Sequence, residues 1–109
     1  MSEKKLVYMT AENQEEAQSI ASVLIAEKLA ACVNIFADMN SVFMWKGEVQ
    51  KEKETAFVAK TTADRIPDLI RRVKEVHSYE CPCIVTLPLD GGNPEFLDWI
   101  QSETGRLSG

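Results

Sequence analysis

Residues 32–45 read CVNIFADMNSVFMW, and this stretch decides the fold. Its residues alternate in the two-residue period of an extended strand, so that one set shares a face. That set is Val33, Ile35, Ala37, Met39, Ser41, Phe43 and Trp45. We therefore predict one long strand over 32–45, with a bulge near residues 39–41 as an open alternative.

The predicted strand is longer than the domain that carries it. Fourteen residues at ~3.3 Å each span roughly 45 Å, whereas a compact domain of this length is only about 34 Å across. Residues 46–48 (KGE) supply a turn, residues 50–54 (QKEKE) read as a solvated arm, and residues 55–61 (TAFVAKT) return as the partner strand. The sequence thus predicts a hairpin that protrudes from the body.

The tip of this hairpin carries Phe43, Met44 and Trp45. Exposed apolar side chains and unpaired strand edges are liabilities for a single chain, so we expect them to pair with neighbouring subunits. The alternative is a sharp bend at Asn40–Ser41 that returns the tip to its own sheet.

The remaining elements can be read outward from the hairpin. A short apolar run ends at Met9 and suits a buried strand, and residues 13–31 follow as a helix with a capping box at Asn13 and Glu16. Its predicted inward face is Ala17, Ile20, Ala21, Leu24, Ile25 and Leu29. Residues 62–77 form a second helix with Pro67 in its first turn, residues 83–89 a short strand, and Asn93-Pro94 opens a last helix.

This order predicts an α+β fold of the ferredoxin-like, split βαβ type. An antiparallel sheet would carry two helices on one face, plus a short C-terminal helix and the long protruding hairpin. We expect a single domain over residues 1–109, because the chain has the length of one hydrophobic core.

Composition excludes several classes of function. Seventeen acidic and twelve basic side chains give a net charge of −5, which argues against a nucleic-acid partner or an anionic membrane surface. The amino-terminal apolar run is too short for a signal peptide or a membrane span, so we expect a cytoplasmic protein with free thiols. One histidine and no recognisable triad or phosphate loop argue against an enzyme.

Residues 77–83 read HSYECPC and form the main candidate metal site. In a split βαβ sheet the first strand ends beside this segment, so we predict a ligand set of His77, Cys81, Cys83 and Met9. Soft sulfur donors with an imidazole favour copper, with zinc as the alternative. The other interpretation is structural: Met9 and Cys83 fill core space and His77 caps the second helix.

The chain also resembles the CutA divalent-cation-tolerance family over nearly its whole length. The matching pieces are AEKLAACVNI (26–35), Ser41, Trp45, Gly47, Glu54, the KT at 60–61, His77, Tyr79, Glu80, Pro82, Pro88, Gly92-Asn93 and FLDWI (96–100). The resemblance implies a tight homotrimer with exchanged hairpins, similar to PII signalling trimers, that is associated with copper tolerance and metal-ion response. Some members carry a cysteine where this chain has Met9.

The resemblance also suggests a second candidate site, a pocket between subunits. Its residues would be Trp45, Glu54, Lys60, Tyr79 and Glu80, and it would bind a small metabolite or a protein partner. The alternative for the charged members is ion pairing that fixes the trimer, and for Trp45 an interface anchor.

Overall fold

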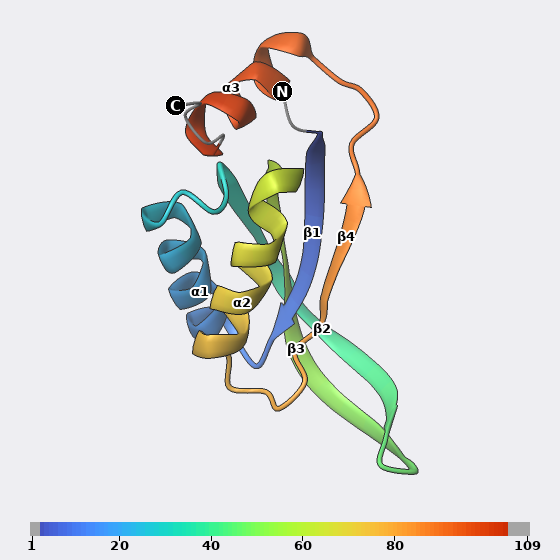
Figure 1. Cartoon of the computed structure of the whole chain (residues 1–109). Helices are drawn as coiled ribbons and strands as arrows, with labels where there is room; N and C mark the ends of the chain where they lie inside the picture. Colours follow the sequence, from blue (N-terminus) through green and yellow to red (C-terminus); the bar gives the residue numbers. More distant parts are fainter. Residues whose placement is uncertain (1–2, 105–109) are drawn as a thin grey trace.

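A computed structural model describes residues 3–104 of the chain (Figure 1). The elements follow as β1 (Lys4–Ala11), α1 (Gln14–Ala26), β2 (Cys32–Trp45), β3 (Glu48–Thr62), a 3₁₀ turn (Ala63–Arg65), α2 (Ile66–Val76), β4 (Ile84–Pro88) and α3 (Pro94–Thr104). The strands form one antiparallel sheet in the order β2-β3-β1-β4. The predicted ferredoxin-like fold is confirmed.

The core lies between one face of the sheet and the helices α1 and α2 (Figure 1). Val7 and Met9 of β1 and Phe57 of β3 point to this side, which we call the helix face. They pack against Ala17, Ile20 and Leu24 of α1 and Leu69 and Val73 of α2. α3 lies across the far end of the sheet, where Ile100 is buried and the Arg65 guanidinium donates to the Thr104 carbonyl oxygen at 2.6 Å.

α1 begins as predicted and ends earlier than predicted. Asn13 Oδ1 accepts from the Glu16 N–H at 2.9 Å, which is the first half of the predicted capping box. The Glu16 carboxylate accepts from the Glu12 and Ser78 N–H groups instead of the Asn13 N–H, so the reciprocal half does not form. At the other end, Lys28 takes a left-handed conformation (φ 58°) and the Leu29 N–H donates to the Leu24 carbonyl at 2.8 Å. This Schellman turn stops the helix at Ala26 instead of the predicted Ala31. Ile25 is 44% exposed, contrary to its predicted place on the inward face.

The β2–β3 hairpin protrudes, as the length of its strands predicted. The chain measures 48 × 26 × 24 Å, and residues 38–55, here called the arm, extend away from the helices (Figure 1). Lys46 and Gly47 both have positive φ (49° and 83°), which is the type I′ turn that closes a two-residue hairpin between the paired Trp45 and Glu48. The charged stretch at 50–54 belongs to β3.

A one-residue bulge divides β2. Ile35 pairs with Phe57 but Asp38 pairs with Thr55, so residues 36 and 37 face a single residue of β3. The bulge therefore lies a few residues earlier than the predicted 39–41. It also corrects the prediction of one shared face: Val33 and Ile35 point to the helix face, whereas Met39 pairs with Glu54 on the opposite face. Ser41, Phe43 and Trp45 follow Met39 by alternation.

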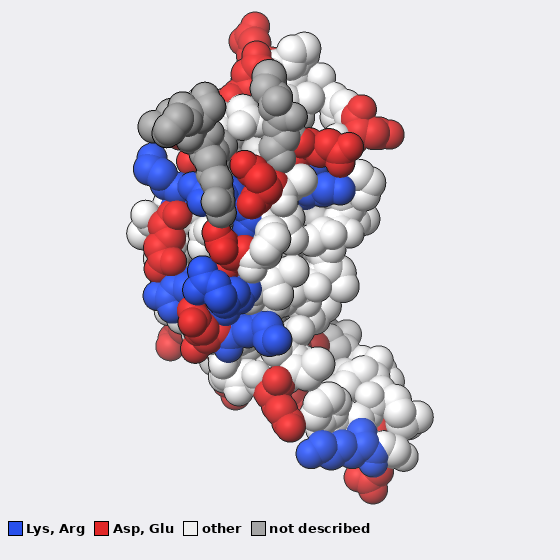
Figure 2. Space-filling view, in the orientation of Figure 1, with Lys and Arg blue, Asp and Glu red and all other residues white. Residues whose placement is uncertain are grey.

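Charged side chains gather over the helix layer (Figure 2). There the Arg72 guanidinium contacts both carboxylate oxygens of Glu27, at 3.0 and 2.9 Å. A largely uncharged surface runs beside the sheet toward the arm in the same view. None of the described helices has both the length and the apolar character needed to cross a membrane.

Candidate functional site

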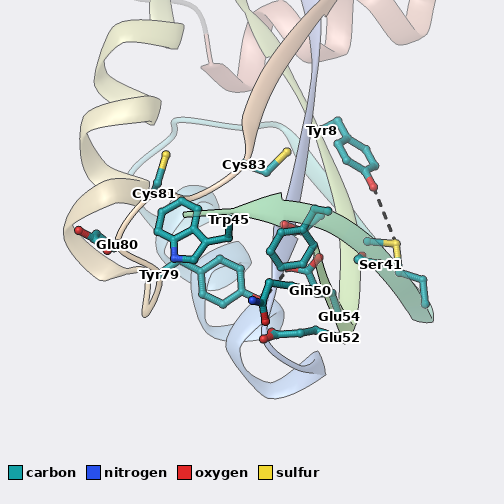
Figure 3. A pocket seen from close by; sticks show the side chains of 13 residues that line it. Tyr8, Ser41, Trp45, Gln50, Glu52, Glu54, Tyr79, Glu80, Cys81 and Cys83 are labelled. Carbon is teal, nitrogen blue, oxygen red and sulfur yellow. Dashed lines mark hydrogen bonds between the residues drawn. The ribbon is translucent and has the colours of Figure 1, made fainter. Parts of the chain in front are cut away.

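A cavity of about 520 Å³ lies where the arm meets the 77–83 segment, which joins α2 to β4 (Figure 3). Thirteen residues line it: Tyr8 and Thr10 from β1, Met39, Ser41, Phe43 and Trp45 from β2, Gln50, Glu52 and Glu54 from β3, and Tyr79, Glu80, Cys81 and Cys83 from the segment. Since Met9 and Phe57 point to the helices, this cavity opens on the other face of the sheet, here called the pocket face. Its lining contains three glutamates and no lysine or arginine.

A hydrogen bond between Tyr79 and Glu54 closes one wall of the pocket. The Tyr79 phenol donates to Glu54 Oε2 at 2.8 Å, and Glu54 is only 8% exposed. Burial raises the pKa of Tyr79, and the hydrogen bond to Glu54 and the nearby negative charges raise it further. The phenol therefore remains a donor at physiological pH.

His77 holds the 77–83 segment against β1. Its Nδ1 accepts from the Tyr79 N–H at 3.0 Å, and its Nε2 lies 2.7 Å from the Thr10 carbonyl oxygen. A carbonyl oxygen can only accept, so these two contacts define the neutral tautomer with the proton on Nε2. The His77 side chain is 0% exposed and uses both ring nitrogens for structure.

Glu16 ties the same segment to α1. Its Oε1 accepts from the Glu12 N–H at 2.9 Å and its Oε2 from the Ser78 N–H at 2.8 Å. Desolvation by burial opposes ionisation of this carboxyl, but the hydrogen bonds from Glu12 and Ser78 outweigh it, and the pKa of Glu16 lies below its ordinary value of 4.5. The pocket wall is thus connected to the helix layer through one carboxylate.

The structure does not bring the four predicted metal ligands to one point. Met9 is 0% exposed in the core on the helix face, and His77 uses both nitrogens, whereas Cys81 and Cys83 line the cavity on the pocket face. Within residues 3–104, no three His, Cys, Asp or Glu side chains gather closely enough to hold a metal ion. One chain offers the pocket its two thiols but not the full predicted set.

The Cys83 thiol is the less accessible of these two. Cys83 is half-buried and Cys81 is exposed, and neither is in a disulfide. Burial raises the pKa of the Cys83 thiol, and the charge of Glu54 adds to the effect. At neutral pH this thiol is protonated, so a soft metal would have to displace its proton.

Most residues of the second predicted site, the pocket, lie close together. Trp45, Glu54, Tyr79 and Glu80 all line the one cavity. Lys60 does not: its ammonium donates to Asn34 Oδ1 at 2.7 Å and lies 5.7 Å from the centre of the Phe96 ring, near α3. Four of the five predicted pocket residues are therefore together within a single chain.

Sequence reasoning missed most of the sheet's contribution to the cavity. Gln50, Glu52 and Glu54 occur at every second position of β3 and point the same way (Figure 3). Glu54 was predicted as a pocket residue, but Gln50 and Glu52 were not, because the stretch QKEKE was interpreted as a solvated arm. Tyr8 and Thr10 had no such signal, because their partners come from another strand and from the arm.

Comparison with known proteins places this geometry in context. The sequence model of the CutA1 divalent ion tolerance protein family matches residues 5–103. A divalent-cation tolerance protein CutA of Thermus thermophilus is 43% identical over 102 residues, covering 94% of this chain and 99% of that protein. The corresponding protein of Archaeoglobus fulgidus is 45% identical over 95 residues, covering 87% and 92%.

Solved structures agree with the sequence relatives. The crystal structure of CutA1 from Oryza sativa has a TM-score of 0.92 at 38% identity, covering 98% of this chain and 97% of that one. The structure of a protein described as the periplasmic divalent cation tolerance protein CutA from Archaeoglobus fulgidus has a TM-score of 0.90 at 42% identity, covering 93% and 98%.

We predict that Glu16 stabilises the fold above its pKa and loses this effect in acid. Because the folded-state pKa is depressed, the contribution is present above about pH 4.5 and disappears as the pH falls through the folded value. The melting temperature of Glu16→Gln should lie below that of wild type at about pH 7, and the gap should close toward about pH 3. Glu15→Gln, an exposed change in the same helical turn, should show the smaller gap; a constant gap for Glu16→Gln would contradict this assignment.

Proposed function

This chain belongs to the CutA1 divalent ion tolerance protein family, and on that basis we propose that it is a non-catalytic cytoplasmic homotrimer that binds copper, or alternatively zinc, as part of metal-ion response. The observation that carries the proposal is the pocket lining, which combines three glutamates and two thiols with no lysine or arginine. Such a lining attracts cations and repels anions.

The arm supports the homotrimer. On its face opposite the pocket, Val42, Met44 and Val49 are 66%, 65% and 60% exposed, and Met44 pairs directly with Val49. β2 is also an edge strand of the sheet. A neighbouring subunit would cover this exposed apolar pair together with the unpaired edge of β2.

The donor types in the pocket support copper as the cation. Met39, Cys81 and Cys83 offer sulfur, which favours Cu(I), with zinc as the alternative. Since one chain supplies no cluster of three ligating His, Cys, Asp or Glu side chains among its described residues, the proposal places the remaining ligands on a neighbouring subunit. The three free thiols suit a reducing compartment such as the cytoplasm.

A second candidate function is a PII-like trimer that binds a small metabolite or a protein partner at its subunit clefts. The size and lining of the cavity favour it, because 520 Å³ is far more than one ion fills and lies in the range of small-molecule pockets. Aromatic rings from Tyr8, Phe43, Trp45 and Tyr79 line the same space.

For the assembly, we predict a light-scattering mass of three chains at micromolar protein concentration. Met44→Glu should release single chains, because it places a charge in the face that the neighbouring subunit covers. Lys74→Glu, an exposed change on α2, serves as the control and should keep the trimer. A single-chain mass for wild type would rule out the trimer.

For the cation, we predict saturable Cu(I) binding by wild type with ascorbate as reductant. The double variant Cys81→Ser, Cys83→Ser should lose more than about tenfold in affinity because it removes the soft donors. His77→Gln should lose much less affinity than the serine variant, since both ring nitrogens hold the 77–83 segment in place and neither is a ligand. Equal losses in His77→Gln and the serine variant would favour the ligand set predicted from sequence, which joins His77 to both thiols. Full retention in the serine variant would rule out the thiol site, and no binding by wild type would leave the second candidate function.

A further inference from the structure

We propose that the pocket is a binding site for a small organic polyamine, an alkyl chain with two or more ammonium groups. This inference rests on the second candidate function and names its ligand class. It does not need the pocket to bind a metal, and it follows from how charge and aromatic surface are distributed around the cavity.

The negative charge in the pocket is spread out. Glu52 and Glu54 project from β3, whereas Glu80 lies on the 77–83 segment at the edge of the cavity (Figure 3). The described residues hold no cluster compact enough for one metal ion. Carboxylates that are separated across a cavity of about 520 Å³ match a ligand whose positive charges are separated too.

Glu54 is the anchor for one ammonium group. It is 8% exposed, so its carboxylate is largely removed from water, and Tyr79 fixes its orientation through Oε2. Oε1 is a second acceptor on the same rigid group. Because a carboxylate accepts N–H bonds, the site selects a primary or secondary ammonium over a quaternary one.

The aromatic residues suit the rest of such a ligand. The rings of Phe43, Trp45 and Tyr79 give an apolar surface for methylene groups, and their faces attract cations. Figure 3 shows Trp45 and Tyr79 among the side chains that line the pocket, together with Gln50, Glu52 and Glu54.

The chain's own Lys46 already makes the contacts that this ligand would make. Its ammonium lies 5.6 Å from the centre of the Trp45 ring and 3.9 Å from a carboxylate oxygen of Glu80, both of them pocket residues. Lys46 is an alkylammonium attached to the hairpin turn, and its exposed side chain is not among those that line the cavity. A free amine would repeat these contacts and add Glu54.

The test is titration of the full-length protein with spermidine at about 0.15 M salt, where loose surface attraction is screened. Trp45 reports binding by fluorescence in a Trp99→Phe background, which removes the tryptophan on α3 and leaves the pocket unchanged. We expect a saturable change. Tetramethylammonium, which has no N–H donor, and Mg²⁺ at equal ionic strength should each fail to reproduce it.

Two charge-matched variants separate the pocket from the overall acidity of the chain. Glu54→Gln should weaken spermidine binding more than about tenfold, because a buried carboxylate partner is lost. Glu103→Gln, an exposed change of the same charge on α3, should leave it within about twofold. Lys46→Gln should tighten spermidine binding, because it removes the competing ammonium. Glu52→Gln leaves the hydrogen bond between Tyr79 and Glu54 intact and should weaken spermidine binding, which keeps the test available if Glu54→Gln fails to fold.

No saturable binding, or equal weakening by Glu52→Gln and Glu103→Gln, would overturn the proposal. Its failure is distinguishable from failure of the metal proposal, because Cu(I) affinity and trimer mass are measured on the same proteins. Spermidine binding with no copper binding would support the polyamine site alone. Copper binding with no spermidine response would reject it.

Discussion

The hydrogen bond from the Tyr79 phenol to Glu54 is the interaction on which the pocket depends. It joins the 77–83 segment to the base of the arm, two parts of the chain separated by 25 residues, and it holds a nearly buried carboxylate in place. Three other contacts orient the segment for this bond: His77 to the Tyr79 N–H, His77 to Thr10, and Glu16 to Ser78. These bonds pair both His77 ring nitrogens, the Ser78 and Tyr79 N–H groups and the Tyr79 phenol.

The bulge in β2 is what places aromatic side chains opposite that segment. Without it, the alternation that puts Val33 and Ile35 against the helices would also turn Phe43 and Trp45 to the helix face, beyond the end of α1 and α2. With the bulge, β2 contributes side chains to the core at one end and to the pocket at the other. Val42 and Met44 then lie on the opposite face of the arm, where both are exposed.

The sequence predicted what depends on local periodicity and length. The bounds of β2, the protruding hairpin, the Asn13 cap and the place of Pro67 all follow from spacing within one element. The bulge was predicted a few residues too late. A bulge inserts a single residue, and the apolar alternation in the sequence continues across it without a visible break. Sequence reasoning also grouped Met9 and His77 with Cys83, because adjacency at a sheet edge does not say which face a side chain takes or which hydrogen bonds already use a ring nitrogen. Lys60 was assigned to the pocket through the family resemblance, and within one chain it lies near α3.

The bond between Tyr79 and Glu54 fastens the 77–83 segment to the sheet. A double-mutant cycle of Tyr79→Phe and Glu54→Ala, measured by denaturant unfolding at one protein concentration, tests it directly. A hydrogen bond to a mostly buried carboxylate predicts a coupling free energy of about 1.5 kcal/mol or more between the two changes. Effects that add to within about 0.5 kcal/mol would contradict the account.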